Sequence, residues 1–437
     1  MKGIETIMKN KELLMEKAMT FAGNVQQNKY LKAISYGLMA TLPLLIIGSI
    51  ALLLMVLPIA PWQNFITSTG IAPYFNVAFT LTTSLIALYS SFTIAYKLAE
   101  YLDENQLTPA FISTLCFLMV VPLANVDGAS FLDIGWLGAK GLFTALVVAL
   151  LSCRLYCYLV GNKKITIKMP ESVPPVVSNT FAGLIPSLIV AAVFLIVAML
   201  FGATSYGSFA AFIYNVIALP LQNLTGSVWS LLLIVIVQMV LWFFGLHGSI
   251  VVGAFITALY LPMDTANMEA AASGVANGEL PNILGKTFYD IFAGIGGAGG
   301  TLSLVILMLI LAKSKQIKTL GKIAIGPGMF TINEPVIFGL PLVLNPIMAI
   351  PFISVPLIQV LVAYGAIATG IVPKLTGVQV PFGMPIFVNG FLAGGWQIAI
   401  LQVVLVVIGM VIYFPFIKMM DKNAVKVEMQ DEKQNMA

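Results

Sequence analysis

The chain has 437 residues, of which 59% are hydrophobic and only 9% are charged, and its formal net charge is +4. Apolar runs of about 20 residues, the length that spans a bilayer, recur along it. This composition excludes a soluble catalytic domain of any size and predicts an all-α polytopic membrane protein with about ten transmembrane helices. Because no Walker A motif occurs, an ATP-driven pump within this chain is also excluded. Membrane lipid is an expected partner, and nucleic acid is not.

The N-terminal residues 1–32 combine six lysines with apolar residues at helical spacing. This pattern predicts an amphipathic helix that lies at the cytoplasmic membrane interface. The stretch is too polar for a cleavable signal peptide. We therefore place the N-terminus on the cytoplasmic side of the membrane.

Residues 1–205 are interpreted as an N-terminal membrane domain with five spans. The expected spans are 30–57, 74–97, 109–125, 134–160 and 178–201. The fourth span leads to the basic residues Arg154, Lys163, Lys164 and Lys168, which the positive-inside rule places in the cytoplasm. Residues 206–225 mix apolar and polar side chains, and we interpret them as an external amphipathic linker helix.

Residues 226–420 are interpreted as a C-terminal, substrate-binding membrane domain, followed by a cytoplasmic tail at 421–437. Its expected spans are 227–244, 288–312, 347–372 and 393–417. The apolar piece 250–261 is too short to span as a straight helix, and the polar segment 262–285 is placed outside. Lysine clusters near residues 313–322 and 418–426 indicate cytoplasmic ends, so both termini are expected in the cytoplasm.

The stretch GPGMFTINEPVIFGLPLVLNP, residues 326–346, places Glu334 inside an apolar run. A charge in the bilayer core costs several kcal/mol, so such residues usually mark a substrate or ion path. Pro335 and Pro341 forbid one uninterrupted helix, and irregular backbone at membrane depth survives only in protein or beside a wet cavity. The stretch predicts a re-entrant hairpin with Glu334 near its tip. A cytoplasmic loop followed by an ordinary kinked helix is the alternative.

The single histidine, His247, lies in the motif WFFGLHGS. Gly245 permits a helix break there, and Trp242 lies about one turn earlier. An intramembrane histidine beside an aromatic platform predicts a polar pocket in which a sugar ring can stack. The alternative is a structural histidine beside an ordinary interfacial aromatic belt.

Other polar and aromatic residues are weaker candidates for substrate contact. They are Asn333, Gln238, Gly245, Trp396 and Gln397. The three cysteines lie in apolar segments without a histidine nearby, so we expect buried small residues and neither a metal site nor a disulfide. No cofactor is expected.

Together, WFFGLHGS and TINEPVIFGLPLVLNP resemble the membrane-embedded EIIC component of the bacterial phosphoenolpyruvate-dependent sugar phosphotransferase system, in its lactose/cellobiose/chitobiose branch. The resemblance covers essentially the whole chain. It implies two re-entrant hairpins, a homodimer formed mainly through the N-terminal half, and a sugar site in the C-terminal half. It also implies elevator-like alternating access and a separate cytoplasmic EIIB protein whose phosphocysteine is the phosphoryl donor.

On this resemblance, the C6 hydroxyl of a β-linked disaccharide lies near Glu334 and His247. Glu334 would act as general base, and His247 would orient the hydroxyl or neutralise developing charge. Asn333 would bind a hydroxyl or hold Glu334, and Trp242 or Trp396 would stack on a ring. Cellobiose is the first expected sugar, followed by diacetylchitobiose and lactose. Whether this chain counts as an enzyme stays open, because the partner supplies the phosphate.

Two other functions remain as alternatives. One is a sugar transporter coupled to protons or sodium, in which Glu334 carries the coupling. The other is a receptor-like membrane protein that binds sugar without moving it.

Overall fold

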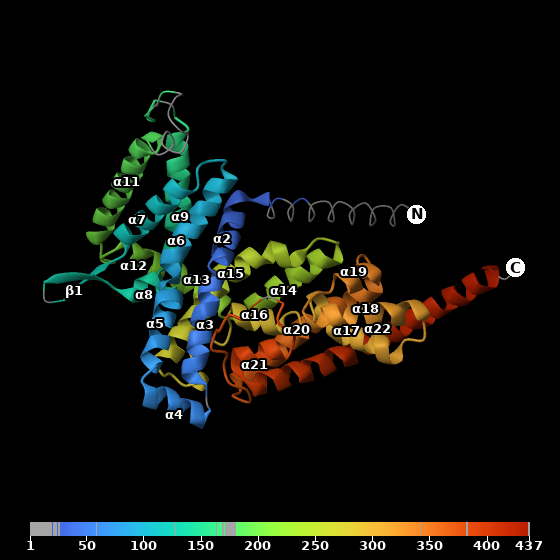
Figure 1. The fold of residues 1–437 in the computed structure, drawn as a ribbon. Helices are drawn as coiled ribbons and strands as arrows, with labels where there is room; N and C mark the ends of the chain where they lie inside the picture. The colour runs from blue at the N-terminus through green and yellow to red at the C-terminus, as the bar shows by residue number, and fades with distance from the viewer. Residues whose placement is uncertain are drawn as a thin grey trace. The chain divides into compact units, whose positions relative to one another are not determined.

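The computed structural model describes residues 20, 24, 27–57, 59–126, 128–162, 164–167, 170, 181–340, 342–381 and 383–435. Most of the described chain is α-helical (Figure 1). Its strands, among these residues, are β1 (Leu123–Val126) and β2 (Ala129–Leu132), which form one antiparallel hairpin. The predicted amphipathic helix of residues 1–32 falls mostly outside the described residues, as do Lys163, Lys168 and Pro341.

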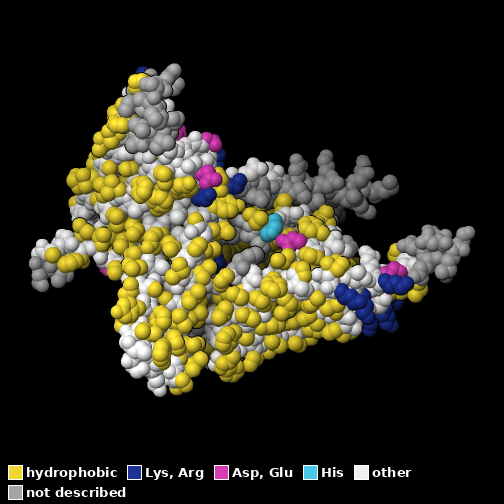
Figure 2. Space-filling view, in the orientation of Figure 1, with side chains coloured by type: hydrophobic (Ala, Val, Ile, Leu, Met, Phe, Trp, Pro, Cys, Tyr) yellow, Lys and Arg dark blue, Asp and Glu magenta, His cyan; other side chains and the backbone are white. Residues whose placement is uncertain are grey.

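Within the described residues, seven helical stretches are long and apolar enough to cross a membrane. They are Lys29–Val56, Ala72–Tyr101, Ala139–Val160, Leu184–Gly202, Gly248–Ala272, Pro346–Ala368 and Trp396–Gln430. The pair Phe209–Thr225 and Val228–Phe243, which is bent by 76°, makes an eighth if counted as one span. Hydrophobic side chains accordingly dominate the surface drawn in Figure 2. The predicted all-α polytopic membrane fold is confirmed, while the count of ten spans stays a prediction.

The chain divides into two compact units. Residues 26–225 and 254–275 form the first, here called the N-terminal unit. Residues 226–253 and 276–437 form the second, which we call the C-terminal unit. The sequence predicts that residues 254–275 belong to the second half, but the structure differs. They belong to the N-terminal unit because Leu261 joins its core and the Glu269 carboxylate accepts the backbone N–H of Ala139 at 3.3 Å.

The N-terminal unit is a bundle centred on α6 (Ile86–Tyr101). Its other helices are α2 (Lys29–Ala40), α3 (Leu42–Val56), α4 (Ala60–Thr69), α5 (Ala72–Thr82), α7 (Leu107–Val120), α8 (Ile134–Leu137), α9 (Leu142–Val160), α11 (Leu184–Gly202), α12 (Phe209–Ile213) and α13 (Leu219–Thr225). Helix α6 packs against α2, α7 and α9. The contact with α2 is close, because a Cβ at Gly37 would lie 2.6 Å from the Ile94 backbone.

The three cysteines are buried, as expected, and each is a free thiol in the structure. Cys153 donates its thiol to the backbone carbonyl of Ala95 at 3.3 Å, which adds a polar contact between α9 and α6. The cysteines therefore serve as small packing residues of the N-terminal unit.

The C-terminal unit contains the stretches singled out in the sequence. Its helices are α14 (Val228–Phe243), the start of α15 (Gly248–Ala272), α16 (Lys286–Phe292), α17 (Thr301–Leu311), α18 (Lys315–Met329), α19 (Glu334–Gly339), α20 (Pro346–Ala368), α21 (Val388–Gly394) and α22 (Trp396–Asn435). Helix α22 packs against α17, α20 and α21, and continues without a break through the expected tail (Figure 1).

Two expected elements of the second half are corrected by the structure. The short piece 250–261 is the start of the 25-residue helix α15, which runs on through Pro262 to Ala272. Asp264 and Asn267, which suggested an external loop, are each only 2% exposed, so this helix buries its polar side chains. The expected span 288–312 is broken into α16 and α17, because four glycines between them adopt positive φ.

Candidate functional site

Glu334 is the first residue of the short helix α19, just after a tight turn. Helix α18 ends at Met329, and Thr331 in the turn adopts a φ of +63°. The two helices pack on each other, since a Cβ at Gly339 would lie 2.6 Å from the Leu320 side chain. Helices α18 and α19 therefore form a hairpin whose tip carries Glu334, and the Glu334 side chain is exposed.

Asn333, at the N-cap position of α19, anchors the tip of this hairpin. The residue is only 4% exposed, and its side-chain Nδ2 donates to the carbonyl oxygen of Ala298 at 2.7 Å. Gly297 makes room for it, because a Cβ there would lie 2.4 Å from the Cγ of Asn333. The glycine-rich break between α16 and α17 thus forms the seat of the hairpin tip.

His247 lies in the turn between α14 and α15. Gly245 enters this turn with a φ of +78°, and the next helix begins at Gly248. The exposed His247 ring contacts the ring of Trp242, with centroids 4.3 Å apart and planes tilted by 46°. Trp242 itself is 5% exposed, so in this conformation its indole supports His247 from the protein side.

A network of side-chain hydrogen bonds holds the Trp242 indole in position. Trp242 donates its Nε1–H to the Ser249 hydroxyl at 3.2 Å, and Gln238 donates its Nε2–H to the same oxygen at 2.9 Å. The Tyr289 hydroxyl donates to Oε1 of Gln238 at 2.7 Å. The close packing of the start of α15 against α14 requires glycine at position 248, because a Cβ there would lie 2.1 Å from the Gln238 carbonyl oxygen.

Ser249 and Tyr289 were not among the residues chosen from the sequence. Ser249 could have been noticed as the hydroxyl that follows His247 by two positions, one residue past the glycine. Tyr289 lies 51 positions from Gln238, its hydrogen-bond partner, so no local pattern reveals it. Both side chains hold Gln238 and Trp242 in place, and Trp242 in turn positions the His247 ring.

The His247 turn and the Glu334 stretch are in direct contact. The backbone N–H of Leu344 donates to the carbonyl oxygen of Phe243 at 2.9 Å, and a Cβ at Gly245 would lie 3.3 Å from Val343. The structure therefore brings the two sequence motifs together, although they are separated by about 80 residues of other helices. Glu334 and His247 are both exposed and share no ion pair among the described residues.

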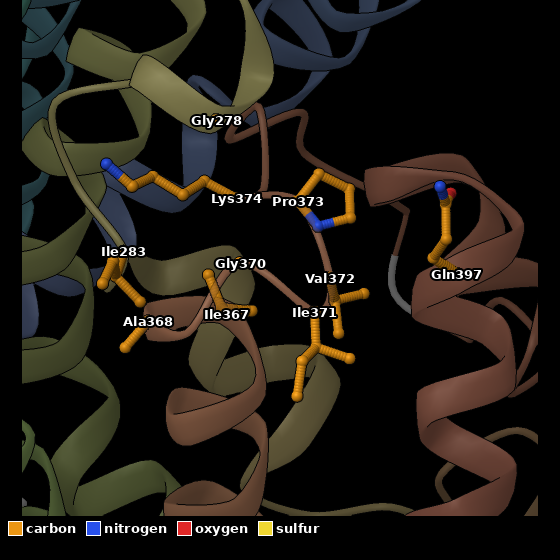
Figure 3. A pocket seen from close by; sticks show the side chains of 10 residues that line it. All are labelled: Gly278, Ile283, Ile367, Ala368, Gly370, Ile371, Val372, Pro373, Lys374 and Gln397. Atoms are coloured by element: carbon orange, nitrogen blue, oxygen red, sulfur yellow. The ribbon is translucent and has the colours of Figure 1, made fainter.

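Trp396 and Gln397 lie elsewhere in the C-terminal unit, at the start of α22. Gln397 lines a pocket at the C-terminal end of α20, together with Gly370 and Lys374 (Figure 3). The Glu334 stretch precedes the opposite end of the same 23-residue helix, which is about 35 Å long. The structure thus does not bring Trp396, which is 61% exposed, together with His247.

The pocket in Figure 3 has a volume of about 540 Å³ and is formed largely by backbone and aliphatic side chains. Its one charged group, Lys374, donates to the carbonyl oxygen of Leu280 at 2.6 Å. The pocket contains neither a carboxylate nor an aromatic ring, so it does not offer the chemistry of the Glu334 and His247 segments.

Comparison with known proteins gives a consistent result. A family model described as "Phosphotransferase system, EIIC" matches residues 35–356. The lichenan permease IIC component of Bacillus subtilis (strain 168) is 37% identical, over 95% of this chain and 95% of its own. The cellobiose-specific EIIC component of Geobacillus stearothermophilus is 36% identical, over 96% of each chain.

A solved structure agrees with these sequence matches. The crystal structure of the transporter ChbC, the IIC component from the N,N'-diacetylchitobiose-specific phosphotransferase system, superposes with a TM-score of 0.89. The two chains are 37% identical, and the match covers 95% of this chain and 99% of that one.

Proposed function

The chain belongs to the phosphotransferase system EIIC family, and we propose that it imports a β-linked disaccharide and presents its C6 hydroxyl for phosphorylation by a separate phosphorylated EIIB protein. The observation that carries the proposal is the contact between the His247 turn and the Glu334 stretch, through Phe243 and Leu344. It joins the segment that carries the Glu334 carboxylate to the turn that carries the His247 imidazole and its neighbour Trp242.

Each of these groups has a role in the proposed reaction. The exposed Glu334 carboxylate accepts a hydrogen bond from the sugar hydroxyl and takes its proton during transfer, as a general base does. His247 orients the same hydroxyl, and Trp242 holds the imidazole from behind. Asn333 keeps its neighbour Glu334 in position through Ala298. Phosphoryl transfer depends mostly on positioning and electrostatics, which these contacts supply.

The relatives guide the choice of sugar. Their names specify lichenan, cellobiose and N,N'-diacetylchitobiose, all of them β-linked glycans. We place cellobiose first, then diacetylchitobiose, then lactose. Phosphorylation would trap the imported sugar, since a charged sugar phosphate does not recross the hydrocarbon core.

The transport step of the proposal is an elevator-like movement of the C-terminal unit within a homodimer held by the N-terminal unit. The division into two compact units, each with its own buried core, supports a movement of one unit as a body. The lysines of α18 and of the last part of α22 favour cytoplasmic placement of these ends, where EIIB would reach the sugar.

The test is phosphorylation of radiolabelled cellobiose, diacetylchitobiose and lactose by vesicles that contain this chain. The assay adds phosphoenolpyruvate and the general phosphotransferase proteins, with and without EIIB. Sugar phosphate that forms only with EIIB supports the proposal and names the substrate. Unmodified sugar that accumulates and is released by an uncoupler would instead establish an ion-coupled carrier, with Glu334 as the coupling site.

A further inference from the structure

A second cavity, apart from the residues of the proposed sugar site, lies between the C-terminal end of α17 and the middle of α22. It has a volume of about 230 Å³. Its lining is amphiphilic: Leu311, Phe414 and Ile417 form the apolar part, and Lys313 and Lys418 form the basic part. Such a combination suits a ligand that has both a charged head and a hydrocarbon body.

The one acidic residue at the cavity, Asp421, is already engaged by backbone groups. Its carboxylate accepts the N–H of Lys313 at 3.0 and 3.1 Å and the N–H of Ser314 at 2.9 Å. Neither Lys313 nor Lys418 takes part in an ion pair within the described part of the chain. Both ammonium groups are exposed, so the cavity presents positive charge to a ligand.

An exposed apolar stripe on α22 leads to Phe414 and Lys418, which line the cavity. Val407, Val411, Phe414 and Lys418 follow one another at helical spacing, and the three apolar residues are 52%, 69% and 44% exposed. The same change from an apolar to a basic side chain occurs at the end of α17, from Ile310, which is 66% exposed, to Lys313 just beyond the helix. Both helices therefore pass from an apolar to a basic surface at the cavity, as expected at a membrane–water boundary.

We propose that this cavity is a binding site for an anionic phospholipid. The lipid phosphodiester lies between Lys313 and Lys418, and an acyl chain follows the stripe of Val407 and Val411. Basic pockets between membrane helices are suited to anionic headgroups, and the apolar stripe distinguishes a lipid from a free phosphate ion. Figure 2 shows Lys and Arg side chains gathered at one end of the hydrophobic surface.

Lipid retention by the purified full-length protein tests this site. Native mass spectrometry would follow titration with phosphatidylglycerol or with phosphatidylcholine of the same acyl chains. We expect the wild type to retain phosphatidylglycerol in preference, and Lys313→Gln/Lys418→Gln to lower that affinity on the order of tenfold. Inorganic phosphate should not displace the bound lipid.

The matched control is Lys322→Gln/Lys426→Gln, which removes the same charge at two exposed lysines outside the cavity. It should retain phosphatidylglycerol as the wild type does. An equal loss in both double variants, or equal retention of phosphatidylcholine, would overturn the site in favour of a diffuse attraction or a purely apolar groove. Should the first double variant fail to fold, Lys418→Gln alone is the second variant, because Lys418 makes no ion pair among the described residues.

Discussion

Asn333 donates its side-chain amide to the carbonyl oxygen of Ala298 over 2.7 Å, across 35 positions of the sequence. This bond joins the tip of the α18–α19 hairpin to the glycine-rich break between α16 and α17. The position of the Glu334 carboxylate therefore depends on the glycine-rich break, which contributes a backbone carbonyl to this bond. Variants of Asn333 and of the glycines should affect transport without touching sugar.

Replacing Asn333 with alanine removes the anchor and leaves the Ala298 carbonyl oxygen buried without this partner. We expect a loss of about 1–3 kcal/mol in the free energy of unfolding and a strong fall in sugar phosphorylation. Thermal unfolding in detergent and the vesicle assay measure the two effects. Asn215→Ala is the control, since Asn215 is exposed and its side chain donates to the carbonyl oxygen of Ala211 within its own helical turn, at 2.8 Å.

Gly297→Ala tests the packing of the glycine-rich break against Asn333 at the tip of the α18–α19 hairpin. The new Cβ would lie 2.4 Å from Cγ of Asn333, at a residue whose φ is +96°, so Asn333 must move and the backbone is strained. We expect destabilisation by more than about 1 kcal/mol and loss of transport. Gly365→Ala, inside α20 and facing open space, should be neutral or slightly stabilising. Wild-type melting temperature and transport in Gly297→Ala would contradict the described packing.

The sequence predicts the helical membrane fold and the hairpin around Glu334, because both depend on local features. Apolar runs of sufficient length indicate membrane helices, and prolines interrupt a helix where they stand. It does not predict the break within 288–312. Glycines permit both a helix and a turn, and only the distant Asn333 and Phe352 occupy the space that excludes a Cβ at Gly297 and Gly299. Likewise, α15 extends to Ala272 because Asp264 and Asn267 are buried, which their polarity alone does not indicate.

In the candidate site, too, contacts between residues close in sequence can be predicted, whereas contacts between distant residues cannot. His247 and Trp242 are near in sequence, and their contact could be anticipated from spacing. The Tyr289–Gln238 bond joins residues 51 positions apart and required the folded chain. Trp396 was chosen for its residue type, yet it begins α22, beside Gln397, which lines a different pocket.

Glu334→Gln separates binding from transfer. The amide keeps the size and one acceptor of the carboxylate but cannot take the hydroxyl proton, so we expect weakened sugar binding and loss of phosphorylation. Equilibrium binding of labelled cellobiose and the EIIB-dependent assay measure these quantities. Glu279→Gln is the matched control, because Glu279 is also exposed but lies in the connection before α16. Phosphorylation by Glu334→Gln at the wild-type rate would remove the general-base role.

Asp421→Ala probes how α22 holds the start of α18. The carboxylate of Asp421 accepts the N–H groups of Lys313 and Ser314, and Glu428 accepts those of Lys315 and Gln316. Removing the Asp421 oxygens should expose the first two amides, because they lose their acceptors. Hydrogen exchange should then be faster at residues 313–314. Asn423→Ala, at an exposed position of the same helix, should leave exchange there unchanged.

His247→Ala distinguishes a functional from a structural histidine. The imidazole is exposed and is held by Trp242 at 4.3 Å, so its loss should remove a sugar contact while the buried chain of Trp242, Ser249 and Gln238 stays intact. We expect sugar binding and phosphorylation to fall together, with an unchanged melting temperature.

Trp242→Phe should reduce sugar binding, phosphorylation and the melting temperature, because it also leaves the Ser249 hydroxyl without one hydrogen-bond donor.

Trp396→Phe completes this comparison between the two tryptophans. Trp396 is 61% exposed, whereas Trp242 is 5% exposed, so an open ring face exists only at Trp396 in this conformation. Trp396 nevertheless lies beside the pocket of Gln397, at the other end of α20 from the Glu334 stretch. We therefore expect Trp396→Phe to leave cellobiose binding near the wild-type value. A loss as large as that of Trp242→Phe would mean that sugar stacks on Trp396, and the proposed binding region would have to move to that pocket.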